Sequence, residues 1–276
     1  MSPVRYRDAP ARRAALLERL TSRGYVSSVE AAEDLGVSEM TIRRDLDRLT
    51  GDGLAQRVAG GASLPRHDAP SFSARRESAG SQKHDIARRA AMLLQNCATV
   101  ALDAGTTVAA LADLLPRHLT VVTHSVPLLT ACTAAGDLGV MSLGGWYEPD
   151  TRSFTGPHAR AALEASAVDV AVLSATALDG RGLYCSSPLD ADVKQCMVAA
   201  AETVVVLADH SKLGRRAPIR FASLDTVDVV VTDAEATTEQ LTPLRAVVES
   251  VLVADREGAR ATVSPEAIRS RTSRRT

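Results

Sequence analysis

The sequence has little cysteine, little lysine and no long apolar run. Its apolar stretches are far shorter than the ~20 residues a helix needs to cross a bilayer, so no membrane span is expected. The cysteines Cys97, Cys132, Cys185 and Cys196 form no C-x-x-C pair and have no histidine at ligand spacing. We therefore expect neither a zinc site nor disulfides, but small buried or half-buried thiols in a reducing compartment.

Motifs for nucleotide cofactors and for a serine nucleophile are also missing. The chain contains no G-x-G-x-x-G, no G-x-x-x-x-G-K-[ST] and no G-x-S-x-G. Neither a dinucleotide nor a nucleoside triphosphate is therefore favoured, and a serine nucleophile elbow is missing. We expect no cofactor, no metal and no catalytic residue. The first residues, MSPVRYRDAPARRAALLERL, carry charges through their apolar stretch, unlike a secretory signal, so a cytoplasmic location is expected.

Basic residues are unevenly distributed and are mostly arginine. The net charge of the 276 residues is −1, yet residues 1–76 carry 13 arginines against 10 acidic residues, and residues 256–276 carry 6 against 2. The net charge of the whole chain therefore conceals two basic ends, and a nucleic-acid partner remains compatible with the composition. Only Lys83, Lys194 and Lys212 are lysine. A residue type this scarce is a somewhat better candidate for a specific role.

The N-terminal part begins with two predicted short helices. Residues 11–23 carry leucines at helical spacing and stop at Gly24. A second helix is capped by Ser27 or Ser28 and ends at Gly36. Its expected inward face consists of Val29, Ala32 and Leu35.

A third helix follows a tight turn and is capped by Ser38. Its inward stripe is Ile42, Leu46 and Leu49, which leaves several polar residues away from the core. These are Glu39, Thr41, Arg43, Arg44, Asp47 and Arg48. Two short helices joined by a Gly-containing turn indicate a helix-turn-helix unit.

A β-hairpin is predicted after the third helix, where Gly-bearing turns flank the run 54–58. Such a hairpin is the wing of a winged helix-turn-helix, which places its third helix in the major groove of DNA and Arg57 within reach of phosphate. A small helical docking module, with the arginines paired to Asp45, Asp47 and Glu39, is the alternative.

The segment VSEMTIRRDLDRLTGDGLAQRVAGGA resembles the signature of the DeoR family of bacterial transcriptional regulators, roughly V-S-x-x-T-I-R-R-D-L-x-x-L-x-x-x-G-x-x-x-R-x-x-G-G-A. The matching residues are Thr41, Ile42, Arg43, Arg44, Asp45, Leu46, Leu49, Gly53, Arg57, Gly60, Gly61 and Ala62. The resemblance favours the DNA-binding interpretation.

Side-chain chemistry suggests roles on double-stranded operator DNA. Thr41 with Arg43 or Arg44 would contact base edges, because a guanidinium can donate to guanine O6 and N7 together. Ser38 and the helix N-terminus suit a phosphate. Asp45 is expected to hold an arginine in place. The predicted DNA-binding set is Ser38, Thr41, Arg43, Arg44, Arg48 and Arg57.

Four regions are expected along the chain: a DNA-binding domain over 1–64, a linker over 65–82, an α/β effector-sensing domain over 83–255 and a basic tail over 256–276, which is predicted to be disordered. In residues 83–255, apolar β-type runs alternate with helical ones. This order predicts a mainly parallel sheet covered by helices, and runs such as TVVVLAD suit strands that are buried on both faces.

Small, hydroxyl-bearing and cationic residues follow several of these strands. In open parallel sheets ligands bind beyond the carboxyl ends of the strands, so the groups point to a polyhydroxylated anion such as a sugar phosphate. For the DAGTT run a plain helix cap is the alternative. The predicted effector-binding set is Asp103, Gly105, Thr106, Thr107, His124, Ser125, Gly144, Gly145, Lys194, Asp209 and Lys212.

The runs LDAGTT, LTVVTHS, LGG, DVKQCM and LADHSKLG resemble successive motifs of the DeoR-type sensor domain. The resemblance implies a fold related to ribose-5-phosphate isomerase and CoA-transferases, and repression of sugar-utilisation genes relieved by a phosphorylated sugar. This chain departs from the family at His124, where Asn is common, at Asp190, where Glu is common, and in LSATALDG. His124 is expected either to bond an atypical effector or to act as a structural imidazole.

Two functions from different classes are compared. The preferred one is a transcriptional regulator that works as a homo-oligomer, because single winged modules seldom bind tightly enough and operators are commonly repeated half-sites. The alternative is a sugar-phosphate isomerase, deaminase or CoA-transferase-like enzyme with a DNA-binding appendage, in which Asp103, Asp190, Lys194, Asp209 and Lys212 would support acid–base chemistry.

Overall fold

The computed structural model describes residues 8–23, 25–52, 54–58, 60–63 and 72–254. The chain divides into two compact units, with the boundary between Ala69 and Pro70, except that Ser186–Leu189 group with the first unit. No helix in these ranges is both long enough and apolar enough to cross a membrane. The predicted tail, 256–276, lies outside the described residues.

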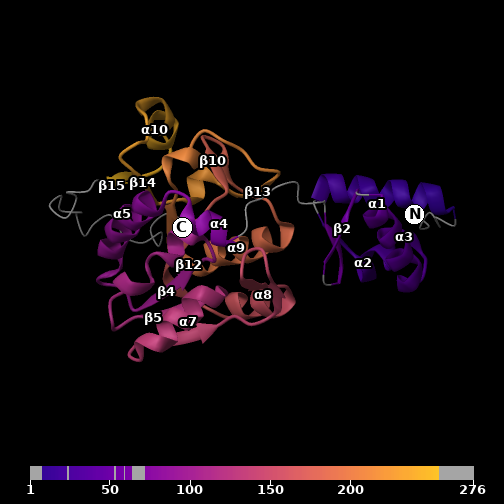
Figure 1. Cartoon of the computed structure of the whole chain (residues 1–276), viewed down its shortest axis with the longest axis horizontal. Coiled ribbons are helices and arrows are strands. Elements are labelled where there is room, and N and C mark those ends of the chain that lie inside the picture. The colour runs from indigo at the N-terminus through magenta and orange to yellow at the C-terminus, as the bar shows by residue number, and fades with distance from the viewer. Residues whose placement is uncertain (1–7, 24, 53, 59, 64–71, 255–276) are drawn as a thin grey trace, which may run out of the picture. The chain divides into compact units, whose positions relative to one another are not determined.

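The first unit combines three helices with a small antiparallel sheet (Figure 1). The helices are α1 (Ala9–Arg23), α2 (Ser28–Leu35) and α3 (Glu39–Gly51). The strands are β1 (Tyr25–Ser27), β2 (Gln56–Val58) and β3 (Gly61–Ser63), in the order β1-β3-β2. The predicted wing is confirmed as the β2–β3 hairpin, and β1 adds a third strand that the sequence did not predict.

Local signals set the helix boundaries in this unit. The side chains of Ser27 and Ser38 cap α2 and α3, and Gly36 ends α2 in the left-handed region at φ 64°. Leu16 and Leu20 pack with the predicted stripe of α3 in one buried cluster. The expected inward face of α2 is wrong at one position: Val29 is exposed, and Ala31 is buried in its place.

The linker predicted over 65–82 differs from the structure in its second half. Helix α4 spans Phe72–Glu77, and α5 (Gly80–Ala91) begins three residues later. Phe72 is buried, so a single apolar side chain anchors α4. One anchor produces no periodicity, which is why the sequence pattern missed this helix. The first half of the predicted linker, up to residue 71, lies outside the described residues.

The second unit is built on a seven-stranded parallel sheet, in the order β15-β14-β12-β9-β4-β5-β6 (Figure 1). The strands are β4 (Thr99–Leu102), β5 (Thr120–Thr123), β6 (Gly139–Ser142), β9 (Val168–Ser174), β12 (Ala201–Leu207), β14 (Val229–Asp233) and β15 (Ser250–Ala254). The predicted parallel sheet is therefore confirmed.

Helices cover both faces of this sheet, and each face has its own apolar core. Besides α5, the helices are α6 (Thr106–Ala109), α7 (Val126–Ala135), α8 (Pro157–Glu164), α9 (Pro188–Ala200) and α10 (Thr238–Arg245). One core joins the sheet to α5, α6 and α7, and the other joins it to α8, α9 and α10. The central strands are buried on both faces, as their apolar runs predicted.

Two smaller antiparallel elements were not predicted from the sequence. One is the hairpin β7 (Trp146–Glu148) with β8 (Ser153–Thr155). The other is the sheet β10-β11-β13, formed by Ala177–Asp179, Gly182–Cys185 and Ile219–Ser223. The four cysteines are free thiols. Cys97, Cys132 and Cys185 are buried and Cys196 is half-buried, in agreement with the predicted burial.

Candidate functional site

The order of the sheet places a topological switch point between β4 and β9. From β4 the chain adds β5 and β6 on one side, and from β9 it adds β12, β14 and β15 on the other. Open α/β sheets bind their ligands beyond the carboxyl ends of the strands at such a point. Asp103 follows β4 there, and Ser174 ends β9 beside it.

A cavity of about 200 Å³ lies at this end of β4, β9 and β12, and we call it the switch-point cavity. Its lining comes from α4, α5, the start of α6, the β7–β8 turn, the loops after these strands and α9. The lining residues are Ala74, Arg75, Ser78, Lys83, Ala104, Gly105, Thr106, Thr107, Thr151, Ser174, Ala175, Thr176, Asp190, Lys194, Leu207, Ala208, Asp209 and Lys212.

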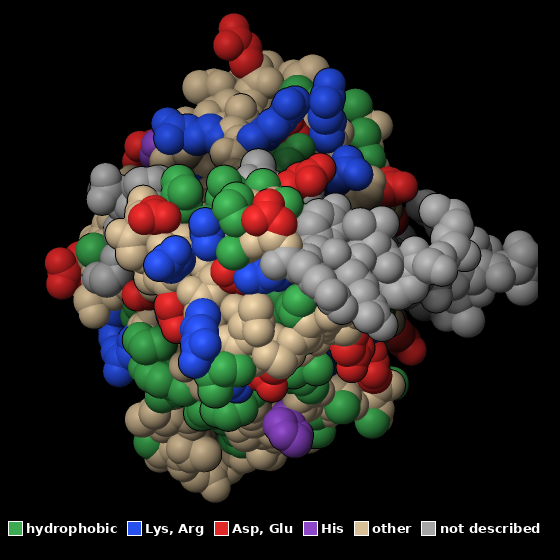
Figure 2. All heavy atoms as spheres, turned by 90° about the vertical axis from the view of Figure 1, so that its right-hand side faces the viewer, with side chains coloured by type: hydrophobic (Ala, Val, Ile, Leu, Met, Phe, Trp, Pro, Cys, Tyr) green, Lys and Arg blue, Asp and Glu red, His purple; other side chains and the backbone are tan. Residues whose placement is uncertain are grey.

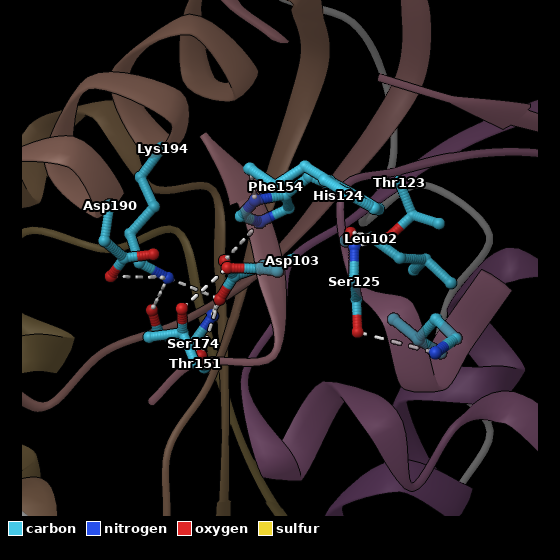
Figure 3. A network of polar contacts seen from close by, with 12 residues as sticks. Leu102, Asp103, Thr123, His124, Ser125, Thr151, Phe154, Ser174, Asp190 and Lys194 are labelled. Atoms are coloured by element: carbon cyan, nitrogen blue, oxygen red, sulfur yellow. Dashed lines mark hydrogen bonds and ion pairs between the residues drawn. The ribbon is translucent and has the colours of Figure 1, made fainter. Parts of the chain in front are cut away.

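Asp103 is the centre of a buried polar network beside this cavity (Figure 3). Its Oδ2 accepts hydrogen bonds from Ser174 N at 2.9 Å, Ser174 Oγ at 2.6 Å and Lys194 Nζ at 2.5 Å. Lys194, on α9, also donates to Ser174 O at 3.0 Å and lies 3.7 Å from Asp190 Oδ2. One buried carboxylate thus ties the ends of two strands to a helix that lines the cavity.

Asp103 and Lys194 each stabilise the charged form of the other. Burial alone would raise the pKa of Asp103, but Lys194, with help from His124, lowers it well below the usual range. Burial would also lower the pKa of Lys194, yet Asp103 and Asp190 raise it above its ordinary value. Asp103 is therefore an anion and Lys194 a cation at neutral pH. Burial raises the pKa of Asp190, although Lys194 opposes this shift.

Six residues of the predicted effector set line the cavity, and a seventh, Asp103, is buried behind it. The six are Gly105, Thr106, Thr107, Lys194, Asp209 and Lys212. Gly105 is required for packing, because a Cβ there would lie 1.8 Å from Ser174 Oγ. Asp209 is buried, and its carboxylate accepts hydrogen bonds from Ser211 N and Oγ.

The other four predicted effector residues are not among the lining residues. The imidazole of His124 is fully buried, bonded through Nδ1 to Phe154 O at 2.9 Å and through Nε2 to Asp103 Oδ1 at 3.4 Å. Ser125 caps α7 through Leu128 N. Gly144 and Gly145 have positive φ angles, and a Cβ on Gly145 would lie 2.3 Å from Thr155 O. These geometries favour the structural alternative for His124.

Sequence reasoning did not select several cavity residues. Arg75, Ser78, Lys83, Thr151, Ser174 and Thr176 line the cavity, and so does Asp190, which was named as a departure from the family pattern and in the enzyme alternative but not in the effector set. The scarcity of lysine was a usable signal for Lys83, since all three lysines of the chain lie at this cavity. Arg75 and Ser78 fell in the predicted linker, and Thr151 follows an unpredicted strand.

Among the residues that the structure describes, two groups of side chains have metal-ligating atoms close together. Asp103, His124 and Asp190 form one group, but the ammonium of Lys194 already lies between its carboxylates. His210, Asp233 and Glu235 form the other, where His210 Nδ1 is bonded to Asp233 Oδ1 at 2.8 Å. In each group a nitrogen of the protein already forms a hydrogen bond with one of the carboxylates, Asp103 in the first and Asp233 in the second.

The predicted DNA-binding residues lie on α3 and on the wing. Arg43, Arg44 and Arg48 are exposed, but Arg43 is paired with Glu39 at 2.7 Å. Within the described residues neither Arg44 nor Arg48 has an ion-pair partner. Thr41, Arg44 and Arg48 follow the spacing i, i+3, i+7, which places them on one face of α3.

The remaining two members of the DNA-binding set are engaged locally. Ser38 Oγ accepts from Thr41 N at 3.2 Å, and Arg57 on β2 pairs with Asp47 Oδ1 at 3.1 Å. Figure 2 shows basic side chains interspersed with acidic ones on the face that it draws, rather than one uninterrupted basic area. Position and pairing, more than total charge, therefore distinguish the candidate DNA contacts.

Asp45 holds an arginine, as the sequence analysis expected. Its carboxylate forms a buried ion pair with Arg12 of α1, and Arg13 Nη1 lies 3.7 Å from its Oδ1. The charged group nearest the middle of α3 is thereby used to fasten this helix to α1.

A winged helix-turn-helix unit followed by an α/β unit with a polar switch-point cavity defines a DNA-binding regulator with a sensing domain. The family model described as the DeoR-like helix-turn-helix domain matches residues 12–67, and that of the DeoR C terminal sensor domain matches residues 78–234. The chain belongs to the DeoR family of transcriptional regulators.

Relatives of known name match most of the chain. The transcriptional repressor AccR of Agrobacterium fabrum is 34% identical over 81% of this chain and 89% of its own length. The glycerol-3-phosphate regulon repressor of Escherichia coli K12 is 30% identical over 79% and 88%. Ribose 5-phosphate isomerase A from Neisseria gonorrhoeae matches 47% of this chain and 52% of its own, with 19% identity and a TM-score of 0.35. The family and the relatives named as repressors are regulators, which does not favour the enzyme alternative.

Proposed function

We propose that this chain represses genes of carbohydrate metabolism and that a phosphorylated sugar, bound in the switch-point cavity, changes its affinity for operator DNA. The protein acts in the cytoplasm as a homo-oligomer, since winged helices bind repeated half-sites in pairs. Thr41, Arg44 and Arg48 contact the operator, with Arg57 near the phosphate backbone. The effector alters operator affinity only if it binds two states of the protein unequally.

The composition of the cavity is the observation that carries this proposal. Lys83, Lys194 and Lys212 supply positive charge, while Thr106, Thr107 and Asp190 supply hydroxyls and a carboxylate. Cations suit a phosphate, and hydroxyls with a carboxylate suit the hydroxyl groups of a sugar. The glycerol-3-phosphate regulon repressor, named for a phosphorylated polyol, matches most of this chain.

A phosphosugar that occupies the cavity is expected to stabilise the folded protein. In a thermal-shift screen of triose, pentose and hexose phosphates, the effector should add about 2.7 kcal/mol at a hundred times its Kd. Lys212→Ala and Thr106→Ala should lose the shift, and Arg117→Ala, an exposed arginine paired with Asp137, should keep it. If no phosphosugar stabilises the wild-type chain, the sugar-phosphate assignment is wrong.

Arg44 is expected to contribute directly to operator recognition. Arg44→Ala should weaken binding to an operator selected from random-sequence DNA by about 1–3 kcal/mol and relax the preference for one base pair. Arg43→Ala should have a smaller effect, because Glu39 already holds that guanidinium. Fluorescence anisotropy measures both affinities. Equal losses in the two variants would contradict the assignment of the Thr41–Arg44–Arg48 face to DNA.

A further inference from the structure

Helix α4 lines the switch-point cavity and is the first described element after the DNA-binding unit along the chain. Along the chain it follows residues 64–71, which come directly after β3. Its Ala74 and Arg75 line the cavity. Two contacts join it to the β7–β8 turn: Arg75 Nη2 donates to Asp150 O at 3.0 Å, and the Arg152 guanidinium lies 5.8 Å from the centre of the Phe72 ring.

The C-terminal end of α4 is held by donors that themselves face the cavity. Lys83 Nζ donates to the carbonyl oxygens of Arg75 and Ser78. Thr106 Oγ1 donates to the same Arg75 carbonyl through a longer contact of 3.5 Å. Both Lys83 and Thr106 line the cavity. Because an ammonium bonds more strongly to an anion than to a neutral carbonyl, an anion in the cavity competes with α4 for these donors.

The joint between α4 and α5 is strained in the state that the structure describes. Ala79 lies in the left-handed region at φ 53° and ψ 40°, where an L-residue other than glycine is disfavoured. Ala79 separates α4, which ends at Glu77, from α5, which begins at Gly80. If Ala79 returned to the right-handed region, α4 could continue directly into α5.

We propose that α4 transmits the occupancy of the cavity to the DNA-binding unit. An anionic effector takes the Lys83 ammonium and the Thr106 hydroxyl from the Arg75 carbonyl, α4 is released, and Ala79 relaxes so that α4 extends α5. The DNA-binding unit is displaced because the chain joins it to the start of α4. This inference rests on the proposed function of the cavity, and it makes Lys83 a positioning residue for regulation.

The first test needs no effector. In the full-length chain, Lys83→Met should speed amide hydrogen exchange over residues 72–78 by about tenfold, since two hydrogen bonds to α4 are lost. Arg88→Met removes a cation from the exposed side of α5, the helix that also carries Lys83, and should leave the exchange of residues 72–78 unchanged. Thr106→Val should act in the same direction as Lys83→Met with a smaller effect. Wild-type exchange in both Lys83→Met and Thr106→Val would overturn the proposal.

A variant that is expected to slow exchange, rather than speed it, distinguishes this mechanism from general destabilisation. Ala79→Gly removes the left-handed strain, so it should favour docked α4 and slow exchange over residues 72–78 by about fivefold. Faster exchange in Ala79→Gly, or none of the expected slowing, would contradict a strained joint. No unfolding of the sensor unit can produce protection above the wild-type level.

Operator binding and phosphosugar binding then distinguish the two proposals. Without any ligand, Lys83→Met should change the affinity of the full chain for its selected operator by at least about fivefold, within the usual range of allosteric coupling. Unchanged affinity in a variant with released α4 would overturn the inference. Ribose 5-phosphate and inorganic phosphate are the probes for the wild-type chain. If neither these nor other phosphosugars bind, the proposed effector fails, while the ligand-free comparisons still decide the role of α4.

Discussion

Asp103→Asn is expected to destabilise the sensor unit by about 3–5 kcal/mol, because it leaves the ammonium of Lys194 buried without its closest anion. The loss is large because Asp103 also accepts the hydrogen bonds of Ser174 that join the ends of β4 and β9. Urea unfolding followed by the fluorescence of Trp146 measures the change. Trp146 is the only tryptophan of the chain, so its signal reports this unit alone.

The pH dependence of stability provides a second test of the contribution of the Asp103 carboxylate. The folded pKa of Asp103 lies below its unfolded value, so its contribution to stability is present at neutral pH and declines as the pH falls below about 4. The difference between the wild type and Asp103→Asn should therefore shrink in acid. Asp113→Asn, an exposed carboxylate on the same unit, should change stability by less than about 0.5 kcal/mol at any pH.

Replacing both partners tests whether the unpaired charge, rather than packing, causes the loss. The double variant Asp103→Leu, Lys194→Met should recover much of the stability, since an apolar pair of similar volume often replaces a buried ion pair at little cost. A double variant as unstable as Asp103→Asn would contradict this explanation and shift the cause to the Ser174 hydrogen bonds.

The parts of this fold that the sequence predicted are those governed by local rules. Helix boundaries at Ser38 and Gly36 follow from capping chemistry, and the buried strands follow from uninterrupted apolar runs. The hairpin β7–β8 and the sheet β10-β11-β13 were missed because their strands form no uninterrupted apolar run and carry no clear alternation. Their pairing is decided by tertiary contacts.

In the candidate site, too, the sequence predicted what local patterns determine and missed what the tertiary arrangement determines. Residues that directly follow β4 and β12 were found, because the end of a buried strand can be recognised in a sequence. His124, Gly144 and Gly145 follow β5 and β6, which lie on the other side of β4 from β9 and β12, and the cavity is lined by residues that follow β4, β9 and β12. The sequence shows where a strand ends but not its place in the sheet, so it could not separate these residues from the cavity lining.

Asp45→Ala is expected to unfold much of the DNA-binding unit, with a loss of about 3–5 kcal/mol, because Arg12 is left as an uncompensated buried cation between α1 and α3. A unit of this size has little stability to spare, so amide protection in α1 and α3 and affinity for the operator should fall together. Hydrogen exchange and fluorescence anisotropy on the full-length chain measure the two effects.

Asp47 supplies the matched control on the same helix. Its side chain is 61% exposed and pairs with Arg57 at the surface, where an ion pair contributes less than about 1 kcal/mol. Asp47→Ala should therefore keep the protection of α3, and by freeing Arg57 it should leave operator binding intact or stronger. Equal losses of protection in the two variants would mean that the buried pair with Arg12 does not fasten α3. The face that carries Thr41, Arg44 and Arg48 would then have to be oriented by the apolar stripe alone.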